Sequence, residues 1–136
     1  MNIYIKTFGC TFNQADSQIM AGLLFEQGNN LVDRPEDADV LLINTCYVKL
    51  PTEQKVVNHI INLQEMFPHK KLIICGCMVD IDQEKLEKIA PDAGWIGPHQ
   101  IGSAPYVVKS ILNDNPVRLT GTNNVVKVCL PKMRSN

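Results

Sequence analysis

The chain has 136 residues and a formal net charge of −1, from 13 basic and 14 acidic residues. Hydrophobic residues make up 45% of it and charged residues 20%, a composition that is typical of a globular domain and excludes a disordered chain. The balanced charge excludes a strong basic field for nucleic acid, and no apolar run is long enough to span a bilayer.

Apolar runs and stretches of helical periodicity alternate along the chain, which begins with a strand rather than a signal peptide. In chain order, we predict a strand at 3–5, a helix at 15–27, a strand at 40–43, a helix between Pro51 and Pro68, a strand at 72–75, a short helix between Asp82 and Pro91, a strand at 95–96, a helix at 103–113 and a strand at 117–119. Strands that alternate with helices form βαβ units. The predicted fold class is therefore α/β: an open, mainly parallel sheet of about five strands, with helices on both faces and a flavodoxin- or Rossmann-like topology. We expect a cytoplasmic protein with no membrane partner.

Two of the predicted helices carry specific expectations. The first has an apolar face that includes Ile19 and Met20, and Gly28 can end it in the left-handed conformation. The side chain of Asp82 is placed to cap the short helix that follows it.

The pattern changes at Thr120, after which a polar stretch leads to one more apolar run and a polar end. Such a segment is typical of a linker that leads elsewhere. We therefore predict one domain at 1–121 and a linker at 122–136 toward a further domain.

The five cysteines are the most informative residues: Cys10, Cys46, Cys75, Cys77 and Cys129. An odd number at wide spacings is a poor disulfide framework, and reduced thiols in a cytosolic protein more often indicate a metal or a reactive site. Cys10, Cys46 and Cys77 each lie just past a predicted strand. Because the carboxyl ends of parallel strands share one end of the sheet, we expect these three thiols to converge there. We expect the turn at Gly76 to leave Cys75 in the core.

Three converging thiolates are compatible with more than one kind of site. They can bind zinc with a fourth ligand, or an iron–sulfur cluster in which one iron stays open. A thioredoxin-type redox site is excluded because the chain has no C-x-x-C motif. A flavodoxin-like nucleotide site is disfavoured because no G-x-G-x-x-G or Walker sequence follows a strand. A non-catalytic α/β domain that binds zinc or a protein partner stays open.

Three sequence motifs resemble those of one enzyme family. The segment Thr7–Ser17, which reads TFGCTFNQADS, resembles the opening motif of the radical-SAM methylthiotransferases. The segments Asn44–Cys46 and Gly76–Met78 resemble the second and third cysteine motifs of the same N-terminal domain. The three motifs occur in order, and the resemblance extends over nearly the whole chain.

The resemblance implies a parallel α/β domain that holds an auxiliary 4Fe–4S cluster on Cys10, Cys46 and Cys77. The open iron of this cluster supplies the sulfur, while Cys75 and Cys129 match no cluster position. A radical-SAM domain with a second 4Fe–4S cluster, which cleaves S-adenosylmethionine to a radical that attacks C2 of an adenine, normally follows. An RNA-binding TRAM domain comes after it. The chain therefore resembles one part of a larger enzyme, and this part is expected to be inactive alone. The implied partners are tRNA and a sulfur donor.

The segment Cys46–Glu53 resembles the archaeal and eukaryotic type within this family. That type converts N6-threonylcarbamoyladenosine at tRNA position 37 to its 2-methylthio derivative. The other types act on isopentenyladenosine in tRNA or on an aspartate of a ribosomal protein, and they stay open as alternatives.

Four further residues are candidates for the surroundings of the cluster or the substrate: Asn13, Asn44, Thr45 and His99. For Asn13, and for the nearby Asp16 and Ser17, we favour helix capping. His99 is expected at the carboxyl end of the sheet, after the fourth predicted strand. We interpret 69–71 as an exposed basic turn rather than as an RNA contact.

Overall fold

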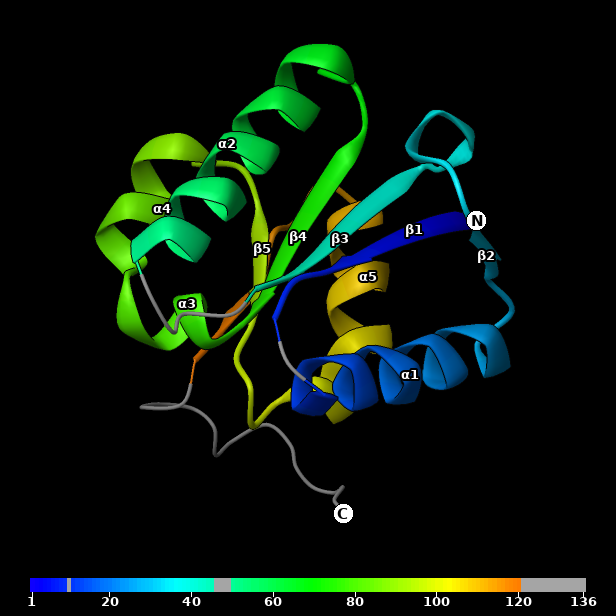
Figure 1. The fold of residues 1–136 in the computed structure, drawn as a ribbon. Helices are drawn as coiled ribbons and strands as arrows, with labels where there is room; N and C mark the ends of the chain where they lie inside the picture. The colour runs from blue at the N-terminus through cyan, green and yellow to red at the C-terminus, as the bar shows by residue number, and fades with distance from the viewer. Residues whose placement is uncertain (10, 46–49, 121–136) are drawn as a thin grey trace.

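The computed structural model describes residues 1–9, 11–45 and 50–120, and within them it has one six-stranded, all-parallel sheet (Figure 1). The strands are β1 (Asn2–Thr7), β2 (Asn30–Val32), β3 (Val40–Thr45), β4 (Lys71–Gly76), β5 (Gly94–Ile96) and β6 (Arg118–Leu119). Their order across the sheet is β2-β1-β3-β4-β5-β6. This order extends the flavodoxin-like arrangement by one strand, which confirms the predicted α/β class.

Helices cover both faces of the sheet (Figure 1). They are α1 (Thr11–Glu26), α2 (Leu50–Met66), α3 (Cys77–Ile81), α4 (Gln83–Ile89) and α5 (Ala104–Leu112), with short 3-10 helices η1 (Pro35–Asp37) and η2 (Ile101–Ser103). The helices α1 and α5 pack on one face, and α2, α3 and α4 pack on the other.

The central strand β3 shows why the sheet needs two helical layers. All six of its residues are buried. Val40 and Leu42 pack into the core on the α1 side, and Leu41 and Ile43 pack into the core on the α2 side. Because successive side chains of a strand point to opposite faces, a strand covered on both faces reads as a continuous apolar run.

The predicted strands are confirmed, whereas several elements of three to five residues were missed. The strands predicted at 3–5, 40–43, 72–75, 95–96 and 117–119 are present as β1, β3, β4, β5 and β6. The edge strand β2 and the one-turn helix α3 were not predicted, because three and five residues are too short to show a period. The sheet therefore has six strands rather than about five.

The first helix is longer than predicted, and its apolar face differs. It begins at Thr11, before the first apolar residue of the period, and Ile19 is 51% exposed whereas Met20 is fully buried. Gly28 follows the helix with φ +106°, as predicted. The predicted cap at Asp82 was wrong, because its side chain makes no capping hydrogen bond to α4.

Some predictions fall on residues outside the described ranges: Cys10, Cys46, Cys129 and the linker at 122–136. Over the residues that the structure does describe, no helix has the length and apolar character that crossing a bilayer requires.

Candidate functional site

The ends of three neighbouring strands lie side by side at the carboxyl end of the sheet (Figure 1). Thr7 of β1 pairs with Asn44 of β3, and Thr45 of β3 pairs with Gly76 of β4. The backbone N–H of Phe8 still donates to Asn44 O, at 2.9 Å, so the β1–β3 contact continues beyond Thr7. The register partners Thr45 and Gly76 are each followed in the sequence by a cysteine, and Phe8 lies two residues before Cys10. The three segments that carry the predicted ligands therefore leave from adjacent strands.

Gly76 allows β4 to approach β3 at this point. Its φ is +98°, a conformation that L side chains rarely adopt. A Cβ atom here would overlap the carbonyl oxygen of Thr45 and lie 2.8 Å from Asn44 Oδ1. Only glycine fits this turn, which leads directly into Cys77.

Cys75 and Cys77 are separated by this turn, as predicted. Cys75 is fully buried, and its Sγ lies 3.6 Å from the carbonyl oxygen of Ile43. Burial, and secondarily the charge of Asp16, raise the pKa of the Cys75 thiol well above its ordinary value. A thiol that stays protonated is a poor metal ligand, because metals bind the thiolate. Cys77 begins α3 and is partly exposed, so it is the described cysteine that suits a ligand.

Asn13 connects the segments that follow β1 and β3. Its amide nitrogen donates to the carbonyl oxygen of Phe8 at 2.9 Å and to the carbonyl oxygen of Thr45. These two bonds differ from those of a helix cap, in which a side chain accepts from a backbone N–H. Asp16 and Ser17 lie well inside α1, so capping was wrong for them.

Asn44 and Ser17 extend these contacts into β1 and α1. Asn44 is buried and donates to the backbone carbonyl of Asn13 at 2.8 Å and to Ser17 Oγ at 2.9 Å. The Ser17 hydroxyl also lies 2.7 Å from the hydroxyl of Thr7. Asn44 thus packs α1 against the ends of two strands.

Thr45 makes the corresponding connection from β3 to β4 and α3. Its hydroxyl donates to the carbonyl oxygen of Cys75 at 2.7 Å and accepts from the backbone N–H of Met78 at 3.2 Å. These two groups flank Cys77 in the sequence. The predicted residues Asn13, Asn44 and Thr45 therefore do come together, through side-chain contacts that the sequence did not reveal.

His99 lies at the same end of the sheet. It follows β5, whose last residue Ile96 pairs with Cys75, and its side chain is exposed. Burial raises the pKa of Asp16, and the nearby His99 opposes that shift. The loop after β5 and the first turns of α1 therefore share this surface.

A contact between Phe8 and His59 was missed by the sequence reasoning. The two rings meet edge to face with their centroids 5.4 Å apart, and Lys6 Nζ lies 5.4 Å from the centroid of Phe8. His59 Nε2 is buried and has no hydrogen-bond partner among the described residues. Burial, and then the charge of Lys6, lower the pKa of His59. The imidazole therefore favours its neutral form and packs as an aromatic ring beside the segment that leads to Cys10.

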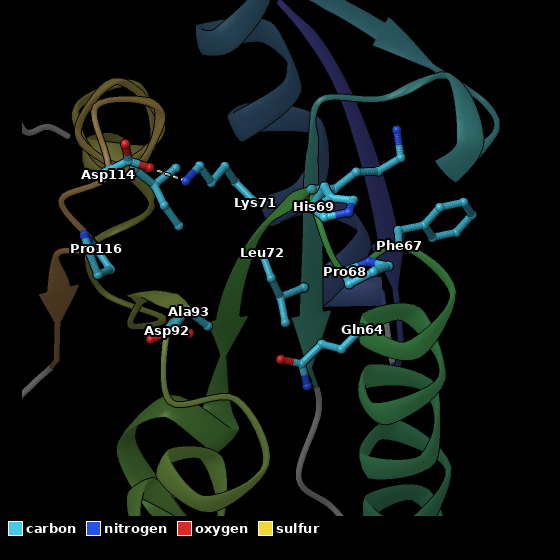
Figure 2. A pocket seen from close by; sticks show the side chains of 12 residues that line it. Gln64, Phe67, Pro68, His69, Lys71, Leu72, Asp92, Ala93, Asp114 and Pro116 are labelled. Atoms are coloured by element: carbon cyan, nitrogen blue, oxygen red, sulfur yellow. Dashed lines mark hydrogen bonds and ion pairs between the residues drawn. The ribbon is translucent and has the colours of Figure 1, made fainter.

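The amino end of the sheet carries a hollow of about 470 Å³, beside the start of β4 (Figure 2). Lys71 forms an ion pair there with Asp114. Lys70 donates to the carbonyl oxygens of Ala38 and Glu36. His69 and Lys70 thus lie in a turn before Lys71, the first residue of β4, and both lysines bind groups of the protein itself. This turn is at the opposite end of the sheet from Cys77.

The described part of the carboxyl end fits a thiolate-bound metal in its chemistry. Soft thiolate ligands select zinc or iron–sulfur clusters, and Cys77 is a partly exposed thiol at the end of a strand. Within 1–9, 11–45 and 50–120, no three His, Cys, Asp or Glu residues are grouped as metal ligands. Two of the three predicted ligands, Cys10 and Cys46, lie outside those ranges.

Comparison with known proteins gives a consistent set of relatives. The family described as "Uncharacterized protein family UPF0004" matches residues 2–97. A "Probable threonylcarbamoyladenosine tRNA methylthiotransferase" of Methanothermobacter thermautotrophicus is 55% identical over 136 residues, which is all of this chain and 32% of that protein. A "Threonylcarbamoyladenosine tRNA methylthiotransferase" of Xenopus laevis is 33% identical over 98% of this chain and 25% of its own length. A "tRNA-2-methylthio-N(6)-dimethylallyladenosine synthase" of Anoxybacillus flavithermus is 34% identical over 96% of this chain and 26% of its own length. The chain spans between a quarter and a third of the length of these curated relatives.

Proposed function

The chain belongs to the UPF0004 family, the N-terminal domain of methylthiotransferases, and we propose that it holds the auxiliary iron–sulfur cluster of a tRNA methylthiotransferase. Cys10, Cys46 and Cys77 are the proposed ligands. The proposed domain is 1–121, and 122–136 is the proposed linker toward a radical-SAM domain. When bound, a cluster on three cysteines supplies an iron with an open position for the sulfur that is transferred.

The observation that carries this proposal is the register of the strand ends. Thr45 pairs with Gly76, and each is followed by a cysteine, while Phe8 joins the end of β1 to Asn44 two residues before Cys10. The strands that precede these three cysteines, which are 36 and 31 residues apart in the sequence, are therefore adjacent in the sheet. Cys75 is an unsuitable ligand, because it is buried and its pKa is raised.

For the substrate, we propose tRNA that carries N6-threonylcarbamoyladenosine. The relative from Methanothermobacter with this name is 55% identical to the chain, whereas the dimethylallyladenosine relative from Anoxybacillus is 34% identical over a similar share of the chain. The segment Cys46–Glu53, with its Val-Lys and proline after the cysteine, supports the same choice.

The test is an activity assay with the complete enzyme that contains this domain. The enzyme is reconstituted anaerobically with iron and sulfide and is given S-adenosylmethionine and a reductant. Two tRNA substrates are compared, one with threonylcarbamoyladenosine and one with isopentenyladenosine. We expect the 2-methylthio nucleoside, measured by mass spectrometry of digested tRNA, from the first substrate alone. Product from the isopentenyladenosine tRNA alone would instead assign the chain to the other tRNA type.

Two cysteine variants serve as the matched pair in this assay. Cys77→Ala is expected to abolish the product, and Cys75→Ala, two residues away, is expected to keep it. Activity that persists in Cys77→Ala would contradict the proposed ligand set. Zinc in place of iron in the reconstituted protein, with no product, would favour a non-catalytic zinc-binding domain.

A further inference from the structure

We propose that Asn13 and Thr45 are positioning residues that hold the three cysteine-bearing segments together before the cluster binds. This inference rests on the proposed function, because it takes Cys10, Cys46 and Cys77 as the ligands. It concerns neither the ligands nor the substrate, but the buried polar contacts that determine where the ligands start.

Asn13 fixes the segments of Cys10 and Cys46 relative to each other. Its side chain is 7% exposed, and its amide donates to the carbonyl oxygens of Phe8 and Thr45. Phe8 lies two residues before Cys10, and Thr45 lies directly before Cys46. One side chain on α1 therefore ties the end of β1 to the end of β3.

Thr45 fixes the segment of Cys77 relative to the same strand end. It is fully buried, donates to Cys75 O at 2.7 Å and accepts from Met78 N at 3.2 Å. The residue that precedes Cys46 therefore binds the backbone on both sides of Cys77, two residues before it and directly after it. Because these groups are shielded from water, each contact is stronger than at the surface, and a broken one leaves an unpaired polar group.

Together the two residues bind backbone groups within one or two residues of all three cysteines. Residues that orient ligands from outside the coordination sphere typically contribute about 10–100-fold to metal affinity. A site whose ligands are already in place also avoids the cost of ordering loops when the metal binds. The expected defect is therefore a cluster that assembles but is held less tightly.

The experiment measures how fast an iron chelator removes the cluster from the anaerobically reconstituted chain. The variants are Thr45→Val, which keeps the shape but removes the hydroxyl, Thr45→Ser, which restores the hydroxyl, and Asn13→Ala. We expect iron release to be about 10–100-fold faster in Thr45→Val and Asn13→Ala than in the parent. Thr45→Ser is expected to release iron at about the parent rate. The electron paramagnetic resonance spectrum of the reduced cluster is expected to change in Thr45→Val and Asn13→Ala and to be retained in Thr45→Ser.

Asn29→Ala is the matched control. Asn29 is also 7% exposed, and its amide donates to Leu24 O at 3.0 Å, but it lies after the other end of α1. The Asn29→Ala variant loses a similar buried contact and is expected to keep the iron-release rate and the spectrum of the parent. Release rates in Thr45→Val and Asn13→Ala that match Asn29→Ala would overturn this inference while the proposed function stands. A parent chain that binds no cluster would overturn the proposed function and this inference together.

Discussion

At the carboxyl end of the sheet, Asn13, Asn44 and Thr45 join strand ends to one another and to α1 through buried hydrogen bonds, whereas at the amino end Lys71 and Asp114 meet as an exposed ion pair. Both ends bring together segments that are distant in the sequence. A buried polar group that loses its partner costs about 1–3 kcal/mol, and an exposed ion pair contributes only about 0–1 kcal/mol. The polar contacts that cost most free energy to lose therefore lie at the carboxyl end of the sheet, where Cys77 follows β4.

The largest expected effect compares two glycines of the same conformation at opposite ends of the sheet. Gly76 has φ +98° at the carboxyl end, and Gly28 has φ +106° at the amino end. A Cβ at Gly76 would overlap the carbonyl oxygen of Thr45, whereas nothing lies within 4 Å of a Cβ at Gly28. We expect Gly28→Ala to lower the free energy of unfolding by about 1–2 kcal/mol, and Gly76→Ala by about 2–5 kcal/mol, because overpacking adds to the backbone strain. Urea denaturation measures both, and equal losses would contradict the close approach of β3 and β4.

The next effect compares a buried amide with a surface charge. Asn44→Ala removes the donor to Asn13 O and Ser17 Oγ, and we expect a loss of about 1–3 kcal/mol in the free energy of unfolding. Lys71→Ala removes the ion pair with Asp114, and the expected loss is about 0–1 kcal/mol. The same denaturation experiment in low and high salt separates the two, because salt screens only the exposed pair. A larger loss for Lys71→Ala would reverse the contrast between the two ends.

The smallest effect is a pH dependence at His59. Burial lowers its pKa below the ordinary value of 6.5, so the unfolded chain binds the proton more readily than the folded one. Stability is therefore expected to fall as the pH drops below about 6.5, and to be retained above it. The His59→Phe variant keeps an aromatic ring against Phe8, and its stability is expected to fall less over this pH range. The change in stability with pH is expected to be smaller than the loss caused by Asn44→Ala. Part of the imidazole is in contact with water, which reduces the cost of charging it in the folded chain.

Thermal melts at pH 7 and pH 5.5 measure this difference, with the exposed amino-end substitution His69→Gln as the control. A melting temperature of His59→Phe that depends on pH as strongly as that of the parent would contradict the role of burial at His59.

The sequence predicts the parts of this fold that depend on local pattern. The apolar run of β3 and the helical period of α2 reflect burial that each element shows by itself. The edge strand β2, with three residues, is too short to show such a pattern, and Ile19 continues an apolar period that the sheet does not cover. These differences depend on which element packs next to which, and a local period does not contain that information.

The site follows the same division. The position of Cys77 after a strand, and the burial of Cys75, follow from reading strands and the turn at Gly76. The roles of Asn13 and Thr45 do not follow, because their partners are 30 to 33 residues away in the chain apart from Phe8. The sequence pattern suggested a helix cap for Asn13, whereas in the folded sheet Asn13 connects the ends of β1 and β3.

The central claim is that three cysteines from adjacent strand ends hold one cluster, and the most direct test counts iron and sulfide per chain after anaerobic reconstitution. The parent is compared with Cys10→Ala, Cys46→Ala, Cys77→Ala and Cys75→Ala. We expect about four irons per chain in the parent and in Cys75→Ala, and loss of the cluster in the other three variants. A parent that binds no iron, or a cluster that depends on Cys75 as strongly as on Cys77, would contradict the claim.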